Sequence, residues 1–390
     1  MNFKKKRLIF RPEYFIFQWH ITESCNWRCK HCYQEWEQPQ ADLSLDQLLA
    51  VFEKYLQFIK YAGVYGKDHT RLTLTGGEPL VRDDFFLFLE KIYPYTSKNY
   101  FFLSLLTNGS MIDEKNAIRL KKLGVRAVQV SLEGMLKYND HVRGSGAFEK
   151  TLRSIKILNN IGIMTCVSFT LTKENILEAP KLIKLCEKKG VRRLGFRRFV
   201  PLGQGKEEQL GIIEPRKLRE FYAYVERRQK GLQVKKAGLT LIRGCEEGIF
   251  AQEVDYPVGA CAVVEGRCLV VLANGDLVPC RRLPIKLGNA LKDDLRKIYY
   301  DSDILSQIRD LNNAHSLCKS CDVFENCLSG ARCVSFAYFN SLFAPDPQCW
   351  RLFKKIPARN KFSKRRAISG ARHRICNRLF GGTSSVIPKA

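Results

Sequence analysis

Apolar residues in the first half of the chain follow two alternating spacings. Short β-rich apolar runs are each followed by a longer amphipathic stretch, from about residue 14 to residue 200. The predicted strands cover residues 14–21, 71–75, 100–106, 126–132, 163–171 and 192–199. Repeated βα units predict a parallel sheet with its site at the carboxyl ends of the strands. Because six units are too few to close an eight-stranded barrel, we expect an α/β fold with an open partial (β/α)6 barrel.

The amphipathic stretches predict helices, and their end signals help to divide the chain. One helix is predicted over 44–62 with Ser44 as its N-cap, one over 114–124 ending at Gly124, and one over 214–230. The βα alternation stops near the Gly-rich segment 201–209, where we expect a domain boundary. The expected parts are a basic N-terminal extension (1–13), the partial barrel (14–210), a helical connection (211–255), a cysteine-rich C-terminal domain (256–352) and a basic tail (353–390).

The cysteine content indicates that this α/β protein binds metal. The chain has 15 cysteines in 390 residues, many of them two to six residues apart. No run of 18 apolar residues occurs, and the first ten residues lack the apolar stretch of a secretory signal. We therefore expect a cytoplasmic protein without a membrane span, where thiols serve metal ligation or redox chemistry rather than disulfides. Cys166 and Cys186 have no partner spacing and are expected to be buried, inert thiols.

Charge adds a class of partner. The formal net charge is +26, which suits an acidic peptide, a nucleic acid or an anionic membrane surface. Charge alone does not choose among them. Part of the excess lies in residues 354–374, which we expect to form a solvated, partly disordered arm. A complex with an anionic partner should weaken as salt is added.

The clearest chemical signal is the motif C-x3-C-x2-C directly after the first strand. It consists of Cys25, Cys29 and Cys32. A four-iron cluster needs one ligand per iron, so three thiolates leave one iron open to a substrate or cofactor. A zinc site completed by His31 or by a distant cysteine is the alternative, since thiolate and imidazole suit tetrahedral zinc.

Further motifs follow the cysteine triplet in a fixed order. They are TGGEPL (75–80), TNG (107–109), VSLEG (130–134), HVRGSGAFEKTL (141–152) and TLTKEN (170–175). Together with the triplet, this order resembles the radical S-adenosylmethionine (SAM) superfamily. The resemblance implies a catalytic [4Fe–4S] cluster on the three cysteines and a bound SAM, from which a 5′-deoxyadenosyl radical is made. It also implies that SAM is held by Gly76, Gly77, Glu78, Asn108, Ser131 and Arg143. Pairing of Arg143 with a nearby glutamate is an equally open reading.

The C-terminal cysteines resemble an SPASM domain, which carries auxiliary iron–sulfur clusters. Eight are concerned: Cys261, Cys268, Cys280, Cys318, Cys321, Cys327, Cys333 and Cys349. Their number alone fits two zinc sites as well as two clusters. The resemblance implies one auxiliary cluster on Cys318, Cys321, Cys327 and Cys349, and a second on Cys261, Cys268, Cys280 and a later cysteine.

One position departs from the SPASM pattern. Ala331 stands where the family has a cysteine, and the next thiol is Cys333. We expect Cys333 to complete the second cluster, on the premise that this segment is an extended loop that keeps both residues on one face. In a helix, Cys333 would point elsewhere.

SPASM-bearing relatives imply a function as a peptide maturase that modifies a ribosomally made peptide or protein. An acidic leader and a reductant such as flavodoxin or ferredoxin are the expected partners. An anaerobic sulfatase maturase is one alternative, although that group has an acidic residue where this chain has Arg281. Tetrapyrrole side-chain modification is another. A zinc-bound nucleic-acid-binding protein is the alternative that is not an enzyme.

Overall fold

The computed structural model describes residues 12–353 except 36–40, 207–210, 212 and 243–259. Its centre is one open sheet with the strand order β10-β9-β8-β1-β2-β3-β4-β5-β6-β7. The barrel strands are β1 (Phe15–His20), β2 (Thr70–Thr75), β3 (Phe102–Leu106), β4 (Ala127–Ser131), β5 (Met164–Leu171) and β6 (Arg193–Arg198). Each pairs in parallel with the next. The predicted strands and the open parallel sheet are confirmed.

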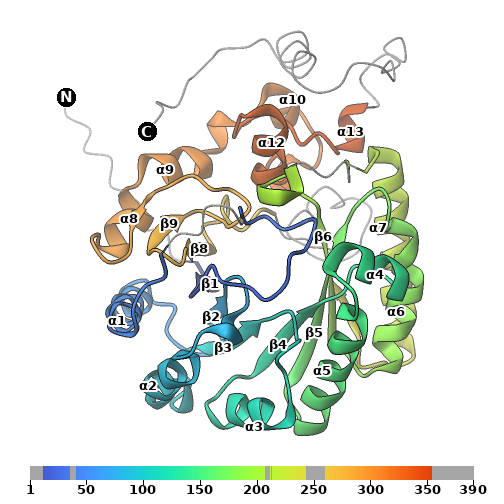
Figure 1. Cartoon of the computed structure of the whole chain (residues 1–390). Coiled ribbons are helices and arrows are strands. Elements are labelled where there is room, and N and C mark those ends of the chain that lie inside the picture. Colours follow the sequence, from blue (N-terminus) through green and yellow to red (C-terminus); the bar gives the residue numbers. More distant parts are fainter. Residues whose placement is uncertain (1–11, 36–40, 207–210, 212, 243–259, 354–390) are drawn as a thin grey trace, which may run out of the picture.

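Helices cover the outer face of the curved sheet (Figure 1). They are α1 (Leu45–Tyr61), α2 (Phe85–Ser97), α3 (Glu114–Lys122), α4 (Leu136–Arg143), α5 (Ala147–Ile161), α6 (Ala179–Lys188) and α7 (Pro215–Val234). The core between sheet and helices is rich in aromatic rings. Trp19 of β1 packs edge-on against Phe88 of α2, with 5.5 Å between ring centroids. Such burial provides most of the free energy that holds these helices in place.

Local signals account for the ends of several helices. Ser44 accepts a hydrogen bond from the backbone N–H of Gln47, and the Gln47 side chain accepts from the N–H of Ser44, so α1 begins with a capping box. The C-cap of α3 is Leu123, one residue before the predicted Gly124, which follows at φ +84°. A left-handed residue of this kind suits glycine because it has no Cβ.

The strands present alternate residues to the two faces of the sheet. On β5, Thr165, Val167 and Phe169 are buried, whereas the residues between them are only partly buried. The second set faces the concave side of the sheet, here called the lumen. Parallel register places Cys166 opposite Arg193 and Thr170 opposite Arg197 of β6. This part of the lumen wall is therefore mostly polar.

The C-terminal part adds strands that the sequence reading missed. They are β7 (Thr240–Ile242), β8 (Cys268–Val271), β9 (Asp276–Val278) and β10 (Gly288–Asn289). Strand β8 pairs in parallel with β1, with Cys268 opposite Ile16, so the C-terminal part extends the barrel sheet. The short β8–β10 strands carry few residues each, which explains why apolar alternation did not reveal them.

Short helices complete the C-terminal part and bridge the gap between the two ends of the barrel (Figure 1). They are α8 (Leu295–Asp301), α9 (Asp303–Arg309), α10 (Ser316–Lys319), α11 (Phe324–Cys327), α12 (Arg332–Phe339) and α13 (Trp350–Phe353). Helix α8 contacts α1, and α13 contacts α7. Within the described ranges, no helix combines the length and apolar character that crossing a bilayer requires.

A buried ion pair joins barrel and C-terminal part. The two outer nitrogens of Arg198 donate to the Asp346 carboxylate at 2.9 and 2.6 Å, and one of them also donates to Gln348 Oε1 at 3.0 Å. The Arg198 and Asp346 side chains are 3% and 5% exposed. This bidentate contact fixes the segment before Cys349 against the end of β6.

Candidate functional site

The first cysteine group lies on the loop that follows β1. Backbone N–H groups point at two of the sulfurs, from Trp27 to Cys25 and from Gln34 to Cys32, each at 3.5 Å. Burial raises the pKa of the Cys29 thiol to about 11, and the two other thiols of the triplet add to this effect while Arg143 opposes it. The structure thus brings Cys25, Cys29 and Cys32 together at the carboxyl end of the barrel, as predicted.

Gly76 and Gly77 hold the turn after β2 against this loop. A Cβ atom on Gly76 would lie 2.2 Å from the carbonyl oxygen of Thr22, and one on Gly77 would lie 2.2 Å from that of Ser24. The backbone N–H of Gly77 donates to the backbone carbonyl oxygen of Thr22 at 2.9 Å. Only glycine fits in this space, so the close approach of the two backbones depends on it.

Glu78 connects the turns after β2 and β3. Its carboxylate accepts hydrogen bonds from Thr107 Oγ1 at 2.7 Å, from the N–H of Asn108 at 2.7 Å and from the N–H of Leu80 at 3.2 Å. Burial raises the pKa of Glu78 to about 7, and these hydrogen bonds oppose the rise. The Asn108 side chain in turn donates to Asn26 Oδ1 at 2.8 Å in the cysteine loop.

A second buried carboxylate lies after β4. Glu133 forms an ion pair with Arg143 and accepts from the N–H of Thr170 at 2.6 Å. His31 Nε2 lies 3.2 Å from the same carboxylate. Burial alone would raise the pKa of Glu133, but Arg143 and His31 lower it to about 2. Arg143 thus pairs with a nearby glutamate, and that pair is buried rather than exposed to solvent.

The remaining polar atoms show whether this end of the barrel fits the implied cofactors. Arg143 Nη1 points to Cys29 Sγ at 3.8 Å. Among the described residues, Arg143 Nε and His31 Nδ1 are buried without a hydrogen-bond partner. Ser131 ends β4 at the same edge. Three convergent thiols and unused buried donors fit an iron–sulfur cluster and the charged end of SAM. The glycine turn fixes the loop that carries the thiols, because only glycine allows the two backbones to approach so closely.

The second cysteine group surrounds a small cavity between α10, α11 and the segment before α13. The cavity is lined by Leu317, Cys318, Cys321, Val323, Phe324, Cys327, Ser329, Gly330, Asp346, Cys349, Arg351 and Leu352. Burial raises the pKa of the Cys349 thiol to about 12, with Asp346 and Cys318 adding to the rise. All members of the first predicted auxiliary set therefore line one cavity.

The third cysteine group lies where β8 meets α12. Cys261 and Cys333 are buried in one apolar cluster, and Cys268 and Cys280 pack against it. The Cys261 thiol accepts hydrogen bonds from backbone N–H groups that include that of Arg332, at the start of α12. The extended-loop premise for Cys333 is wrong, because α12 begins at Arg332. Cys333 nevertheless packs in the same cluster as the other three thiols.

Arg332 was not identified from the sequence, although it lies between the two auxiliary groups. It is completely buried, and the thiols of Cys261, Cys318 and Cys327 all act on it electrostatically. Burial lowers the pKa of its guanidinium, and the thiols act in the opposite direction. The sequence around Arg332 does not reveal this position, because the two cysteine groups are far apart along the chain and only the fold brings them together.

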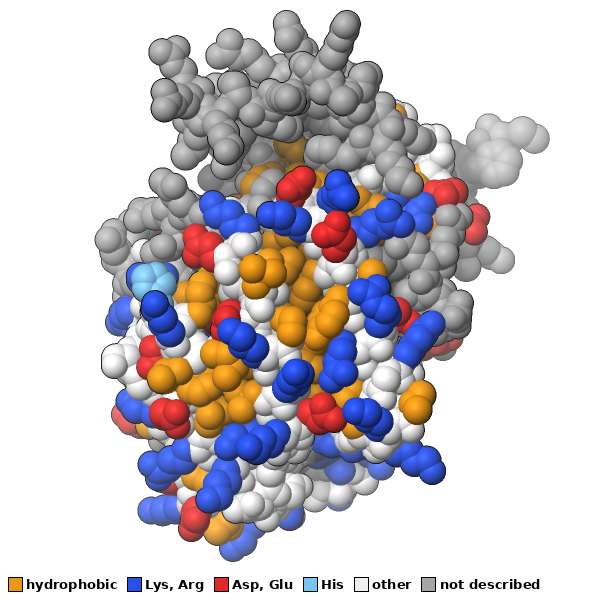
Figure 2. Space-filling model, turned by 90° about the vertical axis from the view of Figure 1, so that its right-hand side faces the viewer, with side chains coloured by type: hydrophobic (Ala, Val, Ile, Leu, Met, Phe, Trp, Pro, Cys, Tyr) orange, Lys and Arg blue, Asp and Glu red, His pale blue; other side chains and the backbone are white. Residues whose placement is uncertain are grey.

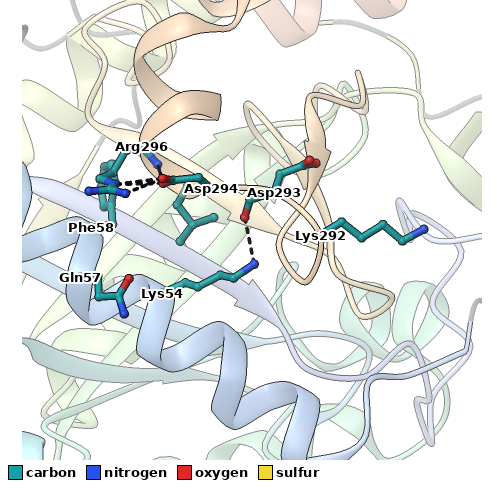
Figure 3. A pocket seen from close by; sticks show the side chains of 8 residues that line it. Lys54, Gln57, Phe58, Lys292, Asp293, Asp294 and Arg296 are labelled. Carbon is teal, nitrogen blue, oxygen red and sulfur yellow. Dashed lines mark hydrogen bonds and ion pairs between the residues drawn. The ribbon is translucent and has the colours of Figure 1, made fainter.

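Beside the cysteine groups, two other kinds of site come into question: a site for a single metal ion and a surface pocket. Across the described ranges, no three His, Cys, Asp or Glu side chains are arranged to hold one metal ion. The pocket in Figure 3 lies between α1 and the segment 292–296. Lys54 Nζ lies beside it and donates to the carbonyl oxygens of Ala290, Leu291 and Asp293 at 2.8, 2.7 and 3.0 Å. These contacts hold the C-terminal part to α1.

Comparison with known families agrees with this arrangement. An open βα barrel with a three-cysteine loop at its carboxyl end defines a radical SAM enzyme, and residues 19–186 match the Radical SAM superfamily. Residues 261–322 match SPASM, an iron–sulfur cluster-binding domain. The chain therefore contains a radical SAM domain and a C-terminal SPASM domain. Its cofactors are [4Fe–4S] clusters and SAM, which replaces the alternative of a zinc-bound nucleic-acid-binding protein.

Individual relatives span two kinds of chemistry. The chain is 25% identical to the AdoMet-dependent heme synthase of Oleidesulfovibrio alaskensis, over 90% of both chains. It is 24% identical to the mycofactocin maturase MftC of Mycolicibacterium smegmatis, over 85% of this chain and 81% of that protein. Streptococcus suis SuiB bound to S-adenosylmethionine has the same fold, with a TM-score of 0.69 at 17% identity over 87% of this chain and 78% of SuiB.

Proposed function

We propose that this chain is a radical SAM maturase that modifies a ribosomally made peptide or protein. The observation that carries the proposal is the presence of one three-cysteine group and two further cysteine groups in a single fold. Relatives named mycofactocin maturase and PqqA peptide cyclase align with 85% and 84% of the chain. The net charge of +26 suits a peptide with an acidic leader. Figure 2 shows many Lys and Arg side chains on the face where α6 and α7 lie.

A second candidate is modification of a tetrapyrrole side chain. The heme synthase of Oleidesulfovibrio alaskensis aligns with 90% of this chain, and the Fe-coproporphyrin III synthase of Methanosarcina barkeri aligns with 87% at 25% identity. Tetrapyrroles of this kind carry several carboxylates, which a basic protein also attracts. Sulfatase maturation is less well supported, because Arg281 stands at the position that is acidic in that group. Its Nη2 pairs with Glu23 Oε2 at 3.9 Å, and its guanidinium carbon lies 4.8 Å from the Tyr33 ring centroid.

In this proposal the residues at the carboxyl end of the barrel have separate roles. Cys25, Cys29 and Cys32 hold the catalytic cluster, and the backbone of Gly76 and Gly77 lies beside SAM. Glu78 and Asn108 fix the surrounding turns through the hydrogen bonds described above. When bound at these residues, the cluster and SAM would supply radical chemistry for hydrogen abstraction. The barrel wall orients the substrate and keeps water from the reacting atoms.

Arg143 and Ser131 lie at the edge of the same site. Arg143 keeps Glu133 ionised and directs one nitrogen towards Cys29. In this proposal its unpartnered Nε is a donor for an anionic group of the cofactor, and Ser131 offers a hydroxyl nearby. Cys318, Cys321, Cys327 and Cys349 hold one auxiliary cluster, and Cys261, Cys268, Cys280 and Cys333 hold the other.

The test measures 5′-deoxyadenosine formed by the anaerobically reconstituted protein with SAM and dithionite. We expect Cys29→Ala to abolish it, because the open iron is lost, and Cys321→Ala to retain part of it without coupling to substrate. Equal loss in both variants, with folding intact by circular dichroism, would show that the roles are assigned wrongly. A mass change in a candidate precursor peptide then supports a maturase, whereas a mass change only in a porphyrin supports the second candidate.

A further inference from the structure

Three arginines from two facing strands lie in the barrel lumen. Arg71 belongs to β2, and Arg193 and Arg197 belong to β6. Their positions alternate with buried apolar residues that face the helices, so all three share the concave side of the sheet. Each is partly buried. None of them is used by the cysteine groups or by the ion pairs described above.

Electrostatic and steric contacts show that the three side chains converge. Arg71 and Arg193 both act on Cys166 of β5 and oppose the rise in its pKa that burial causes. The two arginines therefore reach the same thiol from opposite sides of the lumen. The guanidinium carbon of Arg197 lies 3.9 Å from the position that a Cβ on Gly195 would occupy. Arg197 thus folds over a residue without a side chain, towards Arg193.

No acidic side chain in the described ranges forms an ion pair with these arginines. Within the same ranges, Arg71 Nε and Arg197 Nη1 are buried and have no hydrogen-bond partner. The Arg71 guanidinium lies 4.9 Å from the Phe102 ring centroid, a contact that holds it without neutralising its charge. The next residue after Arg197 provides the contrast, because both outer nitrogens of Arg198 donate to the Asp346 carboxylate.

We propose that Arg71, Arg193 and Arg197 form a binding site for two or more carboxylates of the substrate. Buried donors without partners are costly, and a carboxylate ligand would satisfy the free donors of Arg71 and Arg197 and the charge of all three arginines. The inference rests on the proposed function, and it restricts the substrate of the enzyme to a molecule that carries carboxylates. The chemistry is shared by acidic side chains of a peptide and by the propionates of a tetrapyrrole.

The position of the arginines along the strands gives the orientation of the substrate. Arg193 is the first residue of β6 and Arg71 the second of β2, so both lie near the amino ends of the strands. The cysteine loop follows β1 at the carboxyl end. Arg197 is the fifth residue of β6, and its side chain folds back over Gly195 towards Arg193. Arg71 and Arg193 therefore hold the end of the substrate that does not react, and the reacting carbon points towards the cofactor.

The test is equilibrium dialysis with the full-length, reconstituted protein and matched pairs of probes. The first pair is coproporphyrin III and its tetramethyl ester. The second is a short peptide containing several glutamates and the same peptide with glutamines. We expect one acidic probe to bind at least about tenfold more tightly than its neutral counterpart, because charge-assisted hydrogen bonds to arginine are lost in the neutral one. The acidic probe that binds identifies the source of the carboxylates.

Variants then assign the binding to these residues. The affinity for the acidic probe should fall about tenfold or more in each of Arg71→Gln, Arg193→Gln and Arg197→Gln. The affinity of Arg193→Lys should lie between that of these variants and that of the wild type. Arg192→Gln is the matched control, because Arg192 is exposed and precedes β6. Equal binding of acidic and neutral probes to the wild-type protein, or equal losses in Arg192→Gln, would overturn the proposal. Formation of 5′-deoxyadenosine without any probe tests the proposed function separately.

Discussion

At the scale of single residues, the steric constraint at Gly77 is the sharpest feature of the cofactor end. A Cβ there would lie 2.2 Å from the Ser24 carbonyl oxygen, so Gly77→Ala must push the cysteine loop away. A displacement of about 1 Å costs about 100-fold in rate. We therefore expect 5′-deoxyadenosine formation to fall by about that factor, measured beside iron content.

The control for Gly77→Ala is Gly231→Ala. Gly231 lies inside α7, and a Cβ on it would meet no atom within 4 Å. Alanine should stabilise that helix by about 0.5–1 kcal/mol and leave activity unchanged. If Gly77→Ala were as active as Gly231→Ala, the close approach of the two backbones would have no role in cofactor binding.

Single residues also show what the sequence could predict. The cysteine triplet and the glycine turn were recognisable because their spacing is local and specific. Arg193, Arg197 and Arg198 lie in one run, and only the register of β6 separates two lumen residues from one that faces Asp346. Strict alternation along the run could have placed Arg193 and Arg197 on one face. Arg332 had no such signal, since two distant segments define its surroundings.

At the scale of secondary-structure elements, Lys54 holds α1 to the C-terminal part. Replacing it in Lys54→Met removes three hydrogen bonds from a charged donor to backbone carbonyls. The carbonyl of Asp293 lies in the pocket of Figure 3. We expect the free energy of unfolding to fall by about 1.5–3 kcal/mol, measured by urea titration.

Lys60→Met serves as the comparison, because Lys60 is exposed in the last turn of the same helix. It should change stability by about 0.5 kcal/mol or less. Cofactor cleavage should be unaffected in both variants. A Lys54→Met protein as stable as Lys60→Met would mean that the two parts are held together by apolar packing alone.

The predicted fourth ligand of the second auxiliary cluster, Cys333, lies on helix α12. Cys333 is 4% exposed and packs with Cys261, although it is helical rather than extended. We expect Cys333→Ala and Cys280→Ala each to lose the iron of one cluster, measured by iron content and Mössbauer spectra. Full iron with unchanged spectra in Cys333→Ala would show that this cluster uses three cysteines and keeps an open iron.

At the scale of the whole molecule, the Arg198–Asp346 pair couples the barrel to the cysteine-rich end. Coulombic attraction and hydrogen bonding from Arg198 hold the pKa of Asp346 below its usual range despite burial. Asp346→Asn leaves a buried guanidinium without its counter-charge, so stability should fall by about 3–5 kcal/mol. Thermal unfolding measures the loss.

An exposed ion pair provides the reference for Asp346→Asn. Arg119 and Glu90 pair with side chains that are 41% and 48% exposed. Removing this pair in Glu90→Gln should cost less than about 1 kcal/mol. If both variants lowered the unfolding temperature equally, burial would not be what makes the Arg198 pair important.

The overall architecture could be predicted only for the segments that have a clear local apolar periodicity. The barrel strands and their helices were found because each repeats a clear apolar spacing. The expected basic extension and tail lie mostly outside the described residues, and the predicted helical connection contains β7 at Thr240–Ile242. Strands β8 to β10 were missed, because each is short and is defined by its pairing partner: β8 pairs with β1, β9 with β8, and β10 with β9.

The pairing of β8 with β1 has a consequence for biosynthesis. Ile16 and Cys268 are partners although they lie roughly 250 residues apart, which is a contact of high sequence separation and slow to form. While the ribosome is still making the C-terminal part, one edge of β1 stays open to unwanted strand pairing. Premature termination before β8 would leave that edge exposed permanently. Truncated chains should therefore aggregate, and productive folding of the catalytic half has to wait for the last third of translation.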